Sequence, residues 1–201
     1  LPTPTKIVMN LSAFVGSIYG LLFVVVFIGI GFALKVWYAT PVGRRAIDAF
    51  MLKIPVVGMI LRKIAVARFT RTLGTLISSG VPILEGLDIT ARTSGNAVVE
   101  EALIKVRAAV EGGRNLMDPL KETEIFPNMV TQMVGVGEQT GAMDAMLSKV
   151  ADFYEDEVDA AIKNMLTLME PMMIAFLGVA VGGIVIALYL PLFELIGKLA
   201  G

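Results

Sequence analysis

The side chains that most enzyme chemistry needs are missing from this sequence. Its 201 residues include no histidine and no cysteine, so the commonest general base, the commonest metal ligand and every thiol nucleophile are absent. No catalytic triad or metal-ligand spacing remains. The sequence therefore predicts a protein that is not an enzyme and uses no cofactor. Two patterns are left to explain, a glycine-rich segment at 135–141 and a row of carboxylates at 152–159.

The glycine-rich segment reads Gly-Val-Gly-Glu-Gln-Thr-Gly. Its GxGxxxG spacing follows no predicted strand and precedes no Lys-Ser/Thr pair, so it matches neither the dinucleotide-binding nor the P-loop fingerprint. We predict a turn between two helices at Gly141, with Gly137 one helical turn earlier. Glu138 lies just before this turn, where its carboxylate can accept backbone N–H groups at the start of the next helix. Contact with a partner protein is the alternative role for Glu138.

Four carboxylates share one helical face at spacings of three and four residues: Asp152, Glu155, Asp156 and Asp159. Like charges this close together cost some helix stability. Three interpretations remain open: a solvated face, a docking strip for a basic partner, and a divalent-cation site. Oxygen ligands suit Ca²⁺ or Mg²⁺, but a straight helix lacks the enclosing loop that such sites use.

A basic strip mirrors the acidic row. Arg62, Lys63, Arg68 and Arg71 follow one another along a predicted helix. The strip is either a solvated face that balances the acidic row or a second docking strip for a partner.

The carboxylates and the glycine-rich turn belong to one predicted helical hairpin at 126–158. Pro127 suits the first turn of its first helix, and Gly141 separates that helix from the second. The second helix has an apolar row at steps of three and four residues that lasts until Pro171. The row consists of Met143, Met146, Leu147, Val150, Tyr154, Val158, Ile162 and Met165.

Local signals predict further helices in the polar part of the chain, at 41–54, 62–79, 82–93, 96–111 and 115–122. Gly80 as the residue after one helix and Pro82 at the start of the next define a tight turn. Thr40 and Asn96 are suitable N-caps. No stretch alternates with a period of two between turn residues. We therefore predict an all-α fold, a cytoplasmic six-helix bundle flanked by two transmembrane helices.

Two long segments contain no charged residue, 28 residues between Lys6 and Lys35 and 23 between Glu170 and Glu194. As helices they would reach about 42 Å and about 35 Å, against a hydrocarbon thickness of about 30 Å. The mean hydropathy of +0.76 fits two transmembrane helices in a lipid bilayer. The middle of the chain holds 15 of the 17 basic and 17 of the 18 acidic residues, a net charge of −2. This balance predicts no nucleic-acid partner.

More Lys and Arg residues follow the first predicted span than precede it, which predicts a cytoplasmic bundle with both ends of the chain outside. The predicted organisation is an external linker at 1–6, a transmembrane helix at 7–38, an interfacial amphipathic helix and linker at 39–61, the bundle at 62–170, a second transmembrane helix at 171–196 and an external tail at 197–201. Packing on the bundle is the alternative for the amphipathic helix. We expect Pro171 to interrupt and bend the long helix, and Pro191 to bend or end it. A start without Met suggests a piece of a longer protein.

Two groups of residues resemble the signatures of the type II secretion F family. The first is FTRTLGTLISSGVPIL at 69–84, and the second combines Phe126-Pro127, VGEQTG at 136–141, Tyr154, Glu157, Glu170-Pro171 and Pro191-Leu-Phe193. The resemblance covers the chain from about Trp37 onward. It marks seven family-motif positions to which we assign structural roles: Gly80, Pro82, Gly137, Glu138, Gly141, Pro171 and Pro191.

The resemblance implies a non-enzymatic, multi-pass platform protein of the bacterial inner membrane, in a type IV pilus or type II secretion machine. Its implied partners are a hexameric assembly ATPase, pilin or pseudopilin, other inner-membrane machine components, and further copies of itself in a homo-oligomer. In this interpretation the ATPase pushes on the bundle and the long helix passes the displacement to the second span. The candidate partner-binding residues are Asp152, Glu155, Asp156, Asp159, Arg62, Arg68 and Arg71.

The rival hypothesis is a transporter or receptor fragment with a regulatory helical bundle. It predicts polar groups within the spans or a ligand pocket. Neither feature is visible in the sequence.

Overall fold

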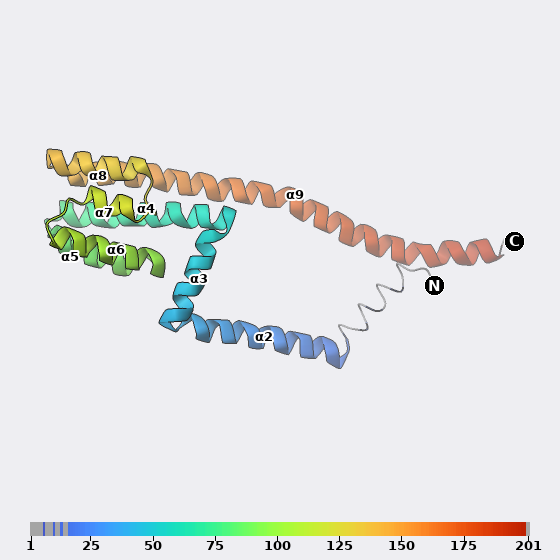
Figure 1. Ribbon diagram of the computed structural model, residues 1–201. Helices are drawn as coiled ribbons and strands as arrows, with labels where there is room; N and C mark the ends of the chain where they lie inside the picture. The colour runs from blue at the N-terminus through green and yellow to red at the C-terminus, as the bar shows by residue number, and fades with distance from the viewer. Residues whose placement is uncertain (1–5, 7–9, 11–12, 14–15, 200–201) are drawn as a thin grey trace. The chain divides into compact units, whose positions relative to one another are not determined.

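The computed structural model describes Lys6, Asn10, Ala13 and residues 16–199, and every regular element in these residues is a helix (Figure 1). The helices are α2 (Ile18–Tyr38), α3 (Pro41–Lys53), α4 (Pro55–Ser78), α5 (Ile83–Thr93), α6 (Ala97–Glu111), α7 (Met117–Glu122), α8 (Asn128–Thr140) and α9 (Met143–Leu199). The predicted all-α class is confirmed. Most of the predicted linker at 1–6 and the end of the predicted tail at 197–201 lie outside the described residues.

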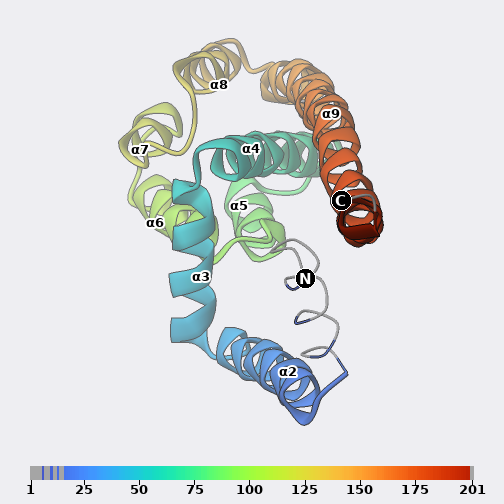
Figure 2. The ribbon, with the colours of Figure 1, turned by 90° about the vertical axis from the view of Figure 1, so that its right-hand side faces the viewer.

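Residues Tyr38–Lys163 form one compact unit, and the segments on either side of this range form another. The first unit is a helical bundle that contains α3 to α8 and the beginning of α9. Within it, α4 runs lengthwise between α5 and α6 on one side and α8 and the beginning of α9 on the other (Figures 1 and 2). The bundle is therefore organised around α4.

One continuous hydrophobic core holds the bundle together. Phe69 of α4 packs against Phe126, which lies just before α8, with ring centroids 4.8 Å apart. Burying one large apolar side chain contributes about 1.5–3 kcal/mol. The side chains that are almost completely buried come from every helix from α4 to α9: Val66, Phe69, Leu73, Leu87, Val99, Leu103, Val106, Leu120, Val130, Val134 and Leu147.

Local chemistry sets the ends of several helices as the sequence predicted. The Thr40 hydroxyl accepts a hydrogen bond from the Gly43 N–H at 3.1 Å, and the Asn96 side chain accepts one from the Val98 N–H at 2.9 Å. Gly80 and Gly141 have φ angles of +81° and +73°, which glycine adopts without strain. Both predicted turns and both predicted caps are confirmed.

Two predicted helix boundaries are wrong. Helix α4 begins at Pro55, about two turns before the predicted start near Arg62, because proline is well suited to the first position of a helix. Helix α9 is not interrupted at Pro171 or Pro191 but continues to Leu199. Each proline removes one backbone hydrogen bond, which the remaining helical hydrogen bonds tolerate. The predicted bends at these prolines stay predictions.

Helices α2 and α9 are both long and apolar enough to cross a membrane. The most apolar window of α2 is 0% buried and that of α9 only 6% buried within the described chain. A core helix of a soluble protein would be mostly buried, so these windows are not core helices of the bundle. Exposed apolar helices of this length are the form that a lipid environment requires.

Gly137 allows α8 and α9 to pack closely on either side of the Gly141 turn. A Cβ atom added at Gly137 would lie 2.9 Å from the Cα of Met143, so the backbone of α9 would have to move. We predict that Gly137→Ala destabilises the bundle by about 1–2 kcal/mol, since overpacking outweighs a gain of about 1 kcal/mol in helix propensity.

Chemical denaturation of the detergent-solubilised chain, followed by circular dichroism, measures this effect. Val136→Ala is the matched control, because Val136 is adjacent on α8 and 47% exposed. Equal stability of the two variants would contradict the proposed role of Gly137.

Candidate interaction surface

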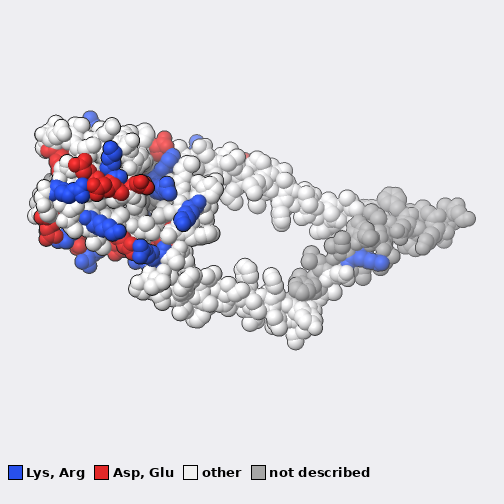
Figure 3. Space-filling view, in the orientation of Figure 1, with Lys and Arg blue, Asp and Glu red and all other residues white. Residues whose placement is uncertain are grey.

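The predicted acidic row and basic strip meet at the contact between α4 and α9. The Nε of Arg71 donates to Glu155 at 2.8 Å, and its Nη2 lies 2.7 Å from the second oxygen of Glu155 and 2.5 Å from Asp152. One guanidinium therefore bridges two carboxylates of the acidic row. In Figure 3, positive and negative side chains are likewise interspersed over the bundle.

This ion-pair cluster changes the electrostatics of its members. The hydrogen bond from Arg71 lowers the pKa of Glu155 below its ordinary value of 4.5. The hydrogen bonds to Glu155 and Asp152 raise the pKa of Arg71, so its charge is permanent. The side chains of Arg71 and Glu155 are 40% and 49% exposed, so solvent screens the attraction. Exposed pairs of this kind contribute about 0.2–1 kcal/mol.

Four of the seven candidate partner-binding residues line one groove between α4 and α9. The groove has a volume of 470 Å³. Arg68 and Arg71 line it from α4, and Glu155 and Asp159 line it from α9. Asp156 is exposed and does not line this groove, whereas Arg62 lines a different cavity. The structure thus brings most of the candidate residues together and separates Arg62 and Asp156 from them.

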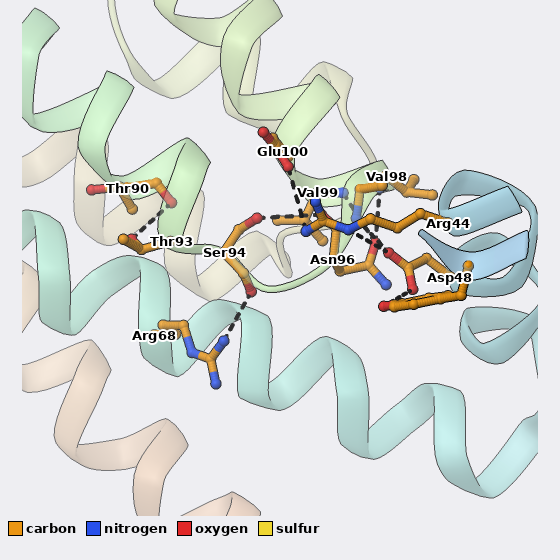
Figure 4. Close-up of polar contacts among 12 residues, drawn as sticks. Arg44, Asp48, Arg68, Thr90, Thr93, Ser94, Asn96, Val98, Val99 and Glu100 are labelled. Carbon is orange, nitrogen blue, oxygen red and sulfur yellow. Dashed lines mark hydrogen bonds and ion pairs between the residues drawn. The ribbon is translucent and has the colours of Figure 1, made fainter. Parts of the chain in front are cut away.

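Not all of these residues are available to a partner. Asp152 and Glu155 are engaged by Arg71, and Arg68 donates a hydrogen bond to the carbonyl of Ser94 at 3.4 Å (Figure 4). Within the described residues Asp156 and Asp159 form no ion pair. They are the carboxylates of the row that remain free to meet a partner.

The sequence did not predict the polar contacts of Lys63 and Asp48. Lys63 binds Glu157 at 2.7 Å and adds a third ion pair between α4 and α9 to the two made by Arg71. Asp48 of α3 is buried, accepts a hydrogen bond from the Ala97 N–H at 2.7 Å and another from the Tyr38 hydroxyl at 3.1 Å (Figure 4). The position of Asp48, an acidic residue without acidic neighbours in an amphipathic helix, was the sequence feature from which a buried contact could have been predicted. Its bonds anchor α3 to the start of α6.

Glu138 accepts a hydrogen bond from a backbone N–H group, but at a different helix from the one predicted. Both of its carboxylate oxygens lie within hydrogen-bond distance of the Leu116 N–H, at 3.0 and 3.1 Å. Leu116 precedes α7, so Glu138 stabilises the start of α7 instead of the start of α9. A carboxylate is favourable at either helix N-terminus. The choice between them depends on the packing of α7 against α8.

In the described part of the chain, no group of three or more acidic side chains is arranged to hold a metal ion. The acidic row at 152–159 is therefore not arranged as a metal site. Its members extend along one helix, and two of them bind Arg71.

Comparison with known proteins identifies the chain's relatives. Residues 69–191 match the family described as type II secretion system (T2SS), protein F. The chain belongs to this family. The matched range includes all seven family-motif positions, from Gly80 to Pro191, and the groove residues from Arg71 onward, whereas Arg68 precedes it.

Several curated proteins are similar to the chain along nearly all of its length. The type IV pilus assembly protein PilC of Myxococcus xanthus is 51% identical over 99% of this chain and 48% of its own length. PilC of Thermus thermophilus is 53% identical over 84% of this chain and 42% of its own length. The type II secretion system protein F of Pseudomonas aeruginosa is 34% identical over 97% of this chain and 48% of its own length. The chain spans about half the length of these relatives.

The lowered pKa of Glu155 predicts that the α4–α9 ion-pair cluster weakens in acid. Above the ordinary pKa of 4.5, both the folded and the unfolded chain have an ionised Glu155, and its stabilisation is complete. As the pH falls, the unfolded chain binds a proton first, so the stabilisation declines and is lost below the folded pKa. Glu155→Gln should therefore cost about 0.5–1 kcal/mol at about pH 7 and less at about pH 3, where the unfolded chain already binds the proton.

Chemical denaturation at the two pH values measures this difference. Asp156→Asn is the control, since Asp156 is on the same helix and forms no ion pair in the described residues. A constant difference between Glu155→Gln and the wild type would contradict the prediction.

Proposed function

We propose that the chain is part of an inner-membrane platform protein, with the bundle in the cytoplasm and both ends of the chain outside. In this proposal it couples a cytoplasmic assembly ATPase to the insertion of pilin or pseudopilin subunits in a type IV pilus or type II secretion machine. It works as a homo-oligomer beside other membrane components and is not itself an enzyme. The relatives are named as type IV pilus assembly and type II secretion proteins, and these names support a role in one of these two machines.

The observation that supports coupling is the continuity of α9. This helix begins at Met143 inside the bundle and reaches Leu199 without a break, so one helix contains both the acidic row and the apolar segment. A continuous helix resists bending over a few turns, because each turn is held by several hydrogen bonds. Force applied to the acidic row therefore has a direct covalent and hydrogen-bonded path along α9.

The relatives favour a pilus machine over a secretion machine. Pilus assembly proteins of Myxococcus xanthus and Thermus thermophilus are 51% and 53% identical to the chain, whereas the secretion protein of Pseudomonas aeruginosa is 34% identical. The rival hypothesis of a transporter or receptor fragment finds no support among these relatives.

The ATPase contact is best tested at the two free carboxylates. Asp156 and Asp159 are exposed, and reversing them leaves the contacts of Arg71 intact. We predict that the double variant Asp156→Lys with Asp159→Lys binds the assembly ATPase of the same cell at least about tenfold more weakly, because two attractions become repulsions. Its thermal unfolding should stay unchanged.

The binding is measured with the purified chain in nanodiscs and the purified ATPase. The double variant Glu85→Lys with Asp118→Lys makes the same change of charge on α5 and α7, and it should bind almost as the wild type does. Equal weakening by both double variants would point to general charge effects. Unchanged binding of the first would show that the acidic row is a solvated face.

A further inference from the structure

A second cavity lies where α3 meets α4, and it differs in character from the α4–α9 groove. It has a volume of 680 Å³ and is lined mostly by apolar side chains. These come from the end of α3, from the start of α4, from the segment that precedes α8, and from α9. Its charged lining consists of Lys53, Arg62, Lys63 and Glu124. We name it the elbow cavity. Because Lys63 is paired with Glu157, Lys53 and Arg62 leave an excess of one positive charge over Glu124, which favours an anionic occupant.

Two of the three positive charges are uncommitted. Lys63 binds Glu157 at 2.7 Å, so its charge is already balanced. Lys53 and Arg62 are exposed, and neither forms an ion pair or a hydrogen bond within the described residues. Both can therefore bind an anion without breaking an existing contact.

A hydroxyl group also lines the elbow cavity without a partner. Tyr154 is 7% exposed and lines the cavity from α9, yet its hydroxyl forms no hydrogen bond within the described part of the chain. The hydroxyl oxygen is open to solvent, since it is not among the buried polar atoms that lack a partner in the described chain. Burial, and next the charge of Glu157, raise the pKa of Tyr154, so the phenol stays protonated at neutral pH and can donate.

The rim of the elbow cavity is apolar and exposed. Met59, which lines the cavity, is 59% exposed, and Val56, about one helical turn earlier on α4, is 57% exposed. Basic residues next to exposed apolar side chains are typical of a surface that lies at a membrane interface. Two residues separate the end of α2 from the start of α3, and the cavity lies at the other end of α3, so 15 residues of chain connect it to a segment that can span a membrane, two in the link and 13 in α3.

We infer that the elbow cavity binds the headgroup of an anionic phospholipid. Lys53 and Arg62 contact the phosphate, the Tyr154 hydroxyl donates a hydrogen bond to it, and the acyl chains lie along Met59 and Val56. An acidic protein segment would use the same cations but would leave the apolar rim exposed to water. This inference is independent of the ATPase contact, because none of its residues belongs to the acidic row.

Photocrosslinking tests the inference. The chain is placed in nanodiscs of phosphatidylcholine that contain a photoactivatable phosphatidylglycerol, and the adducts are mapped by mass spectrometry. We expect adducts at residues 50–63. The double variant Lys53→Glu with Arg62→Glu should lower this labelling at least about tenfold, since each basic residue near an anionic membrane contributes about a factor of five. Tyr154→Phe, which retains the packing of the ring, should lower it less.

The controls separate this site from general attraction to the membrane. Lys105→Glu with Lys149→Glu makes the same change of charge at exposed positions outside the elbow cavity, and labelling should stay as in the wild type. A photoactivatable phosphatidylcholine should label residues 50–63 weakly. Equal labelling by both lipids, equal loss in both double variants, or complete competition by soluble glycerol phosphate would overturn the inference.

Discussion

Gly74 brings the backbone of α4 so close to α9 that an added Cβ would lie 3.1 Å from the Cβ of Leu147. This approach places Leu147 in the same core as Phe69 and Leu73, and it brings Arg71 within reach of the acidic row. Core burial supplies most of the stabilisation here, since exposed ion pairs contribute only about 0.2–1 kcal/mol each. The ion pairs instead fix the register of the two helices, and the rest of the bundle packs around this contact.

The α4–α9 contact also explains how the bundle can act on a long helix. The beginning of α9 is held along α4 by a buried core and two groups of ion pairs, which involve Arg71 and Lys63. In the proposed function, the bundle is thus the part that receives force, and α9 is the part that conveys it. Asp156 and Asp159 are exposed on the same helix and suit a contact with the moving partner.

Local signals in the sequence predicted much of the fold, but they could not predict contacts between residues that are far apart in the sequence. The caps at Thr40 and Asn96 and the turns at Gly80 and Gly141 depend on neighbouring residues only, so they could be predicted. The pairing of Arg71 with the acidic row depends on the register of α4 against α9, which no local pattern encodes. The same reason explains why Glu138 caps α7 and not α9. The predicted helix boundaries at Pro55 and Pro171 were wrong, because a proline is compatible with either the start or the continuation of a helix.

The claim that α9 conveys force is tested most directly by breaking its continuity. Two glycines inserted after Asn164 lie beyond the bundle and interrupt the helix, and the same insertion at the turn of Gly112 and Gly113 is the control. The measurement is the yield of assembled pili from cells that contain the full-length protein with either insertion. The account predicts that the insertion in α9 abolishes assembly while ATPase binding persists, and that the control assembles pili. Normal assembly with the insertion in α9 would contradict it.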